Sequence, residues 1–217
     1  MNHRDQGTPP IALLPWIATG LAYRSSDFDA DDVYIFTCRL NDAGDLALQF
    51  SGTAGDGAFV CSAAALGSGS EKIHIAQGGA SLSRSGGHVD ETAPTQAFPP
   101  FLLSRALFAA LKAGETIAWP TVLTGDGQTV AVTKTGTGTQ QVRVHGKRQT
   151  VPTIVAQGDD VDLVVLDDAS WPLILVNREA DDCGWQLRAV GSDLDADTLA
   201  DGGDGDAADD DEVDDDE

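Results

Sequence analysis

Two adjacent aspartates, Asp167 and Asp168, are the carboxylates in this sequence best placed for acid–base chemistry. They directly follow the apolar run Val161–Leu166. A general acid and base need environments that push their two pKa values apart, whereas neighbouring residues at a strand end point to opposite sides, and Asp is a common turn former. We therefore expect a turn here. The alternative is a carboxylate-dependent hydrolase that uses Asp167 and Asp168, with His145 as their partner.

The histidines give little support for catalysis. His74 and His145 alternate with Ile and Val residues, which is typical of imidazoles on the solvent face of a strand. His88 lies in a polar loop two residues before Asp90, and His3 lies near the start of the chain. The sequence contains no G-x-S-x-G, H-E-x-x-H, Walker or G-x-G-x-x-G motif. It therefore predicts no catalytic residue and no cofactor.

The cysteines do not form a metal motif. Cys38, Cys61 and Cys183 are an odd number, and none lies in a C-x-x-C or C-x-x-H pair. Cys38 and Cys61 fall in apolar, strand-like runs, where a buried free thiol behaves as a small hydrophobic side chain. A disulfide between these two residues is the alternative if the protein is exported.

The end of the chain carries one calcium-like spacing. Asp193, Asp195 and Asp197 repeat the first ligand spacing of an EF-hand loop, but Thr198 occupies the position at which that loop needs glycine. Loose, screened binding of cations to a polyanion explains the acidic run better. We therefore predict no specific metal site.

The charge distribution excludes some partner classes. The net charge is −22, and the last 25 residues contribute 14 acidic side chains and no Lys or Arg, which leaves about −8 on the rest. Nucleic-acid affinity depends on clustered Lys and Arg, and the densest basic stretch, 143–148, fits a solvated strand entering a turn. The acidic run instead favours a protein partner with a basic surface. Only four lysines against 35 acidic residues would also suit high salt.

The N-terminus and the absence of long apolar runs bear on location. No run is long enough to span a bilayer, so no membrane insertion is expected. Residues 11–22 are apolar over a signal-peptide length, but Pro15 interrupts the run and Asp5 cancels the charge of Arg4. We expect an apolar or irregular segment at 1–19, one β-rich domain at 20–191, and a disordered acidic tail at 192–217, with a cleaved signal as the alternative.

One helix stands out, at about 101–113. Leu103, Leu107, Ala110 and Leu111 share one face at helical spacing. The residues that follow fit a helix end, because Lys112 complements the helix dipole and Gly114 can take the left-handed cap conformation.

Alternating apolar residues separated by turn residues predict strands through most of the remaining chain. The frequency of these strands indicates a mainly β (α+β) fold, a curved antiparallel sheet or partly open β-barrel with one short covering helix. The predicted strands are 33–40, 46–51, 58–62 running on towards 66, 72–75, 116–122, 129–133, 141–145, 151–155, 161–166, 172–176 and 185–190, with a long loop at 78–96.

Residues 101–190 resemble a group of uncharacterised β-rich bacterial cell-envelope domains, found alone or before outer-membrane-protein-A-like domains. The matching segments are Gly114–Ile117, Val142–Gly146 and Leu166–Leu173, and Gly20–Tyr23 is similar to the entry strand of such domains. The resemblance implies an open β-barrel-like fold and a cell-envelope or periplasmic setting, and it carries no catalytic residues. The sequence thus predicts a non-enzymatic binding or structural module with an acidic solubilising or partner-steering tail.

Overall fold

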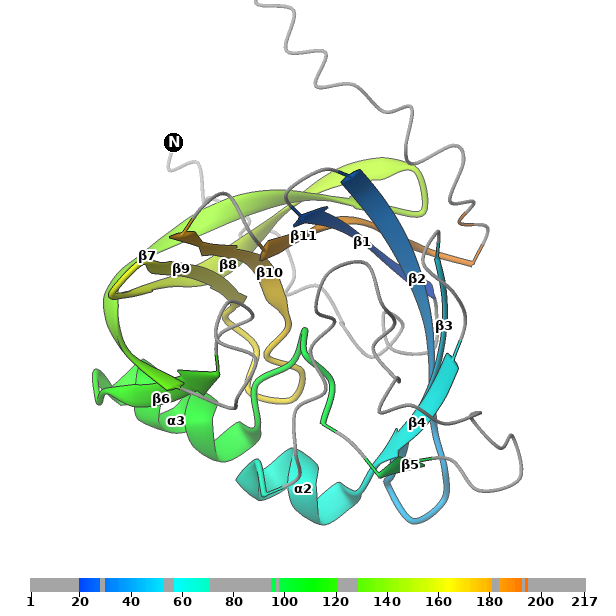
Figure 1. Ribbon diagram of the computed structural model, residues 1–217, viewed down its shortest axis with the longest axis horizontal. Coiled ribbons are helices and arrows are strands. Elements are labelled where there is room, and N and C mark those ends of the chain that lie inside the picture. The colour runs from blue at the N-terminus through cyan, green and yellow to red at the C-terminus, as the bar shows by residue number, and fades with distance from the viewer. Residues whose placement is uncertain are drawn as a thin grey trace, which may run out of the picture.

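A single, strongly curved sheet dominates the computed structural model, which describes residues 20–27, 30–52, 57–70, 95–96, 98–120, 129–180, 184–192 and 194. Eleven strands in these residues follow the order β5-β4-β3-β2-β1-β11-β10-β9-β8-β7-β6. The sheet bends into a partial ring, and the two helices lie at its open side (Figure 1). The prediction of a mainly β fold with a curved antiparallel sheet is confirmed. The strands are β1 (Gly20–Asp27), β2 (Ala30–Leu40), β3 (Leu46–Gly52), β4 (Gly57–Cys61), β5 (Thr95–Gln96), β6 (Ile117–Pro120), β7 (Thr129–Val144), β8 (Lys147–Gly158), β9 (Val161–Leu166), β10 (Ile174–Glu179) and β11 (Gly184–Gly191).

The first described strand joins the last one. β1 pairs antiparallel with both β2 and β11, with Gly20 opposite Gly191. A Cβ atom at Gly20 would lie 2.8 Å from the carbonyl oxygen of Gly191, so this close approach requires glycine. β11 also pairs in parallel with the end of β7, at Ala189–Arg143 and Val190–Val144. The first and last described strands, β1 and β11, are therefore neighbours in the sheet, next to the end of β7. We call this meeting of β1, β11 and β7 the seam.

β7 corrects the prediction of two separate strands. Residues 129–133 and 141–145 belong to one 16-residue strand, which pairs with β8 along its length and bulges between Lys134 and Gly136. The Thr- and Gly-rich stretch between them has no apolar face, and it is ordered by pairing with β8. Pro152 lies in β8, between β7 and β9 in the sheet, one residue beyond the end of the β8–β9 ladder at Thr153. There its missing N–H breaks no bond to β9.

The helices differ from the prediction in number and start. α3 spans Arg105–Ala113 and begins four residues later than expected, because Ser104 caps it by accepting the Leu107 N–H at 3.2 Å. Gly114 takes the predicted left-handed cap conformation at φ 85°. A second helix, α2 (Ala63–Ser68), replaces the expected extension of β4 towards Leu66. It begins at an N-cap serine and ends at Gly69, with φ 72°.

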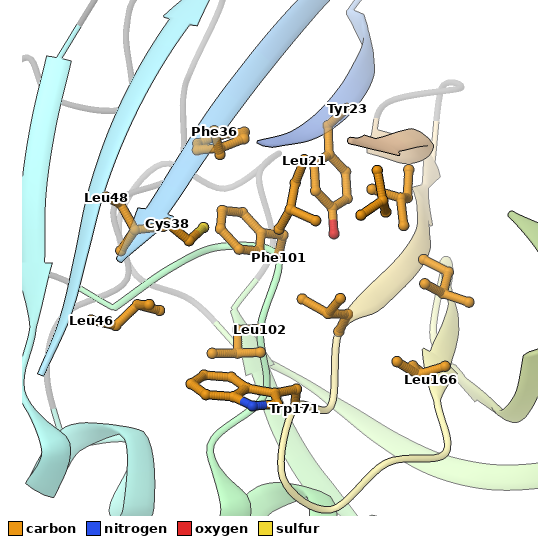
Figure 2. Packing of buried hydrophobic residues seen from close by; sticks show 14 of the residues in the cluster. Leu21, Tyr23, Phe36, Cys38, Leu46, Leu48, Phe101, Leu102, Leu166 and Trp171 are labelled. Carbon is orange, nitrogen blue, oxygen red and sulfur yellow. The ribbon is translucent and has the colours of Figure 1, made fainter. Parts of the chain in front are cut away.

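The buried side chains form two clusters. The first lies within the curve of β1–β4, where Phe101 lies among Leu21, Tyr23 and Phe36 (Figure 2). Phe101 stacks on Tyr23 with ring centroids 5.2 Å apart, and the Tyr23 hydroxyl donates to the Ile174 carbonyl at 3.1 Å. The segment before α3 therefore forms part of the core rather than the helix. The second cluster joins α3, β6 and the β8–β10 sheet; its members are Leu103, Phe108, Leu111, Ile117, Trp119, Val132, Ile154, Ala156, Val161, Leu163, Val165 and Ile174.

The alternative of a Cys38–Cys61 disulfide is wrong. Both thiols are free and buried. Cys38 is opposite Leu48 on β3, and Cys61 is opposite Leu46 on the same strand, so β3 separates them. Strands two apart are separated by roughly 9–10 Å, which exceeds the roughly 7 Å Cα limit of a disulfide.

Several predictions fall outside the described residues. These are the segment 1–19, the strand 72–75, the tail from residue 195 on, His3, His74, His88 and Cys183, and most of the loop 78–96.

Candidate functional site: a buried polar cluster between β6, β10 and β11

Two polar side chains lie inside the second apolar cluster. Asn177 and Glu179 on β10 are only 1% and 5% exposed. Their partners across the ladder to β9 are Leu163 and Val161, which belong to the second cluster. Directly opposed residues of an antiparallel pair share a face. Asn177 and Glu179 therefore lie on the face of the sheet that α3 and β6 cover.

Two tryptophans complete the group. Trp185 on β11 is opposite Asn177 in the β10–β11 ladder. Trp119 on β6 packs in the second cluster, and its ring centroid is 6.4 Å from that of Trp185, with the planes tilted by 47°. We call Trp119, Asn177, Glu179 and Trp185 the polar cluster.

The polar cluster is only partly paired. The Asn177 side-chain Nδ2 donates to Oε1 of Glu179 at 2.9 Å. Among the described residues, however, Oδ1 of Asn177 and Nε1 of both Trp119 and Trp185 are buried atoms without a hydrogen-bond partner. A buried polar group left in this state costs about 1–3 kcal/mol. Three such atoms within one group mark a place where a polar partner would be stabilised.

Local sequence features set the positions of these four residues. Gly184 has φ 143°, and a Cβ atom there would overlap the carbonyl oxygen of Asn177. This glycine lets β11 approach β10 closely and brings Trp185 opposite Asn177. On the other side, α3 ends at Gly114, and β6 starts three residues later with alternating buried residues Ile117 and Trp119.

The polar cluster presents both hydrogen-bond donors and acceptors. The two indole N–H groups can only donate, and the free amide oxygen can only accept. Glu179 adds a carboxylate, which disfavours anions and favours neutral or cationic groups. Apart from the Glu179 carboxylate, the cluster contains no side chain of the types that commonly act as a nucleophile or base, such as serine, cysteine, lysine or histidine.

The aspartates predicted from the sequence have separate roles. Asp167 forms an ion pair with Lys112 of α3 at 2.5 Å. Asp168 caps the turn that follows β9, because its Oδ1 accepts the N–H groups of Ser170 at 2.7 Å and Trp171 at 3.2 Å. The prediction that Asp168 forms a turn is thus confirmed.

His145 lies away from both aspartates. With Gly146 it forms the two-residue turn between β7 and β8, with φ values of 47° and 76°. Asp167 instead contacts β8 at Pro152, whose carbonyl accepts the Asp167 N–H at 3.0 Å. The five intervening residues of β8 span roughly 17 Å. The structure therefore does not bring His145 together with the aspartate pair.

The described residues show neither a metal cluster nor a membrane-spanning helix. No group of three or more His, Cys, Asp or Glu side chains among them is arranged to hold a metal ion. Likewise, none of the helices formed by these residues has the length and apolarity needed to cross a membrane.

The polar cluster could not be predicted from the sequence because a bulge reverses the alternation. The β9–β10 ladder shifts between Ile174 and Val176. Simple alternation from Ile174 would place Arg178 on the face of the second cluster, whereas the bulge places Asn177 there. The only signal in the sequence was the three polar residues that follow the apolar run 172–176.

Comparison with protein-family models, with curated proteins and with solved structures finds no match to this chain.

Proposed function

We propose that the chain is a non-enzymatic binding module that holds a small polar ligand at the polar cluster. The observation that carries this proposal is that Trp119, Asn177 and Trp185 each hold a buried polar atom without a partner among the described residues. The Trp119 and Trp185 rings are neighbours, and Trp185 is opposite Asn177 in the ladder. A ligand that pairs with them would recover hydrogen bonds that the described residues leave unmade. The apolar surroundings would strengthen each bond.

The donor and acceptor pattern defines the ligand class. A group that pairs with all three atoms needs an acceptor for the two indole N–H groups and a donor for Oδ1 of Asn177. A neutral primary amide has both. A carboxylate of the same shape lacks the donor, and it would meet the charge of Glu179.

Acetamide and acetate are therefore a matched pair of probes. In the full chain labelled with ¹⁵N-tryptophan, acetamide should shift the indole resonances of Trp119 and Trp185 in a saturable way. Acetate at the same concentration should leave both in place. Trp119→Phe and Trp185→Phe identify the two resonances, because each change removes an N–H and retains an aromatic ring.

Trp171 is the internal control. It is buried in the first cluster, away from the polar cluster, and its indole should not respond to either probe. Equal responses of all indoles, equal responses to acetate, or no response of Trp119 and Trp185 to acetamide would each contradict the proposal.

The acidic end of the chain supplies a second element of the proposal. We infer that residues 193–217, with their 14 acidic side chains, steer a protein partner with a basic surface and keep the chain soluble. Deletion of 193–217 should weaken binding to a lysine-rich probe peptide and flatten its salt dependence. An unchanged affinity and salt slope would count against this role.

The proposal also covers the cellular location and the exclusion of nucleic acid as a partner. The segments Gly114–Ile117, Val142–Gly146 and Leu166–Leu173 support a bacterial cell-envelope location through their resemblance to envelope domains. The net charge of −22 argues against nucleic acid as a partner.

A further inference from the structure

The β7–β8 hairpin carries an unneutralised basic end. Arg143 and Arg148 are direct partners across the ladder, and Lys147 follows the turn. All three side chains are exposed, and none of them makes an ion pair in the part of the chain that the structure describes. Like charges placed opposite each other on neighbouring strands repel. This hairpin end is therefore suited to an anionic partner.

The last described residues of the chain lie beside this basic end. The backbone N–H of His145, in the turn, donates to the carbonyl of Val190 at 2.7 Å. Arg143 is opposite Ala189 in the β7–β11 pairing, two residues before β11 ends. A Cβ atom at Gly191 would lie 3.6 Å from Nδ1 of His145 and 3.7 Å from Cδ2 of Leu194. Leu194 thus lies next to the seam from which the hairpin projects.

The acidic segment after Leu194 can reach the hairpin easily. Residues 195–217 hold 13 acidic side chains and no basic ones. For comparison, a random coil of 23 residues has a root-mean-square extension of roughly 25 Å, and residue 194 is only three residues from Gly191. Tethering of this kind gives an effective concentration on the order of millimolar. Weak charge pairing is then sufficient for the segment to occupy the hairpin.

We propose that the acidic segment 195–217 binds in cis to the basic hairpin end formed by Arg143, Lys147 and Arg148. A basic partner in trans must then compete with the protein's own hairpin for the acidic segment. This inference rests on the partner-steering role proposed for the same segment, and it adds a control on that role. Three cations neutralise only part of the negative charge of the segment. The remaining acidic side chains can make the first contact with a basic partner, which then displaces the hairpin.

Carbodiimide cross-linking of the full chain tests the proposal directly. The reagent joins a carboxylate to a lysine amine with loss of water, and Lys147 is the amine at the hairpin. At low salt and low protein concentration, peptides that join Lys147 to 195–217 should dominate within the monomer. They should fall several-fold in 1 M salt, where the Debye length is about 3 Å, and in the variant Arg143→Gln/Arg148→Gln.

The chain provides two internal controls. Lys112 already contacts Asp167, so its cross-link to that residue should form in every variant. Lys134 lies towards the other end of β7, beyond the bulge, and it should join the acidic segment much less often than Lys147 does. The substituted arginines are exposed and lie outside the turn residues, so the fold should be retained.

Three outcomes would overturn the inference. These are equal cross-linking of Lys134 and Lys147 to the segment, no loss in the Arg143→Gln/Arg148→Gln variant, and cross-links found only in dimers, which would place the segment on a second copy. Failure of the steering role looks different. In that case the lysine-rich probe peptide would bind equally with and without 193–217, whatever the Lys147 cross-links show.

Discussion

Asn177 donates a hydrogen bond of 2.9 Å to Glu179, two residues further along β10, and both side chains are buried. Residues two apart on a strand share a face, so the pair is oriented by the backbone itself. An amide is the neutral group that can donate to a buried carboxylate while keeping an acceptor for a second partner. The pair thus stabilises Glu179, and Oδ1 of Asn177 has no partner among the described residues.

Asn177→Asp should be strongly destabilising at neutral pH. The change replaces the donor by a second carboxylate inside an apolar cluster, which is expected to cost about 3–5 kcal/mol. Urea unfolding of the variant and of the wild type at neutral pH measures this loss.

Gln157→Glu is the matched control for that change. Gln157 also donates an amide N–H to a carboxylate, that of Asp162, at 2.8 Å, but the contact is exposed. Solvent screening should limit its cost to under about 1 kcal/mol. Equal effects of Asn177→Asp and Gln157→Glu would show that burial does not govern the Asn177–Glu179 pair.

Two glycines around the end of α2 should respond in opposite directions. Gly69 has φ 72°, and a Cβ atom there would lie 3.0 Å from Oγ of Ser104. Gly69→Ala should therefore destabilise by about 1–2 kcal/mol, from left-handed strain and the crowded serine. Gly67 lies within the helix, and a Cβ atom there would have no neighbour within 4 Å, so Gly67→Ala should stabilise by about 0.4–1 kcal/mol.

Thermal unfolding of the two alanine variants provides the comparison. The midpoint should fall for Gly69→Ala and rise for Gly67→Ala. Two variants that are both destabilised would contradict the helix boundary at Gly69.

Local patterns in the sequence were sufficient for much of the fold. The strand Val161–Leu166 was predicted with its observed bounds, and the end of α3 followed from Lys112 and Gly114. These elements depend on alternation and on cap residues that act within a few positions of the chain. Interactions between residues close together in the sequence were therefore enough to predict these elements.

The polar cluster depended on features that no local pattern carries. Trp119 and Trp185 are 66 positions apart in the sequence, and only the strand order brings their rings within 6.4 Å. The bulge before Val176 then sets which face Asn177 takes. α2 was missed for a related reason, since a short apolar run such as residues 63–66 fits a strand as well as a helix.

The two adjacent aspartates should differ in their effect on stability. Asp168→Ala removes an acceptor from two backbone N–H groups in the turn before Trp171, and we expect a loss of about 1–2 kcal/mol. Asp167→Ala removes an exposed ion pair with Lys112 and should cost about 0.2–1 kcal/mol, less in high salt. Denaturant unfolding in low and high salt separates them, and a larger cost for Asp167→Ala would contradict the assigned roles.

Alkaline pH should destabilise the first cluster through Cys38 and Tyr23. Burial raises the pKa of Cys38 from 9.0 to about 12. Burial, together with the nearby Cys38 thiolate, also raises the pKa of Tyr23 well above 10.0. Both groups are neutral in the fold at pH values where the unfolded chain would ionise them. Their contribution is fully present below about pH 9, and it is lost as the pH rises towards 12.

The size and the controls of this effect follow from the same two groups. A shift of three pKa units corresponds to a loss on the order of 4 kcal/mol for Cys38, so unfolding free energy measured from pH 8 upwards should fall steeply. Cys38→Ala should flatten that slope. Tyr23→Phe should flatten it too, and should also cost about 1 kcal/mol at neutral pH through the lost bond to the Ile174 carbonyl. Since the thiolate is the reactive form of cysteine, native Cys38 should resist iodoacetamide at pH 8 and react after unfolding. Rapid alkylation of the native protein at Cys38 would contradict the burial of this thiol.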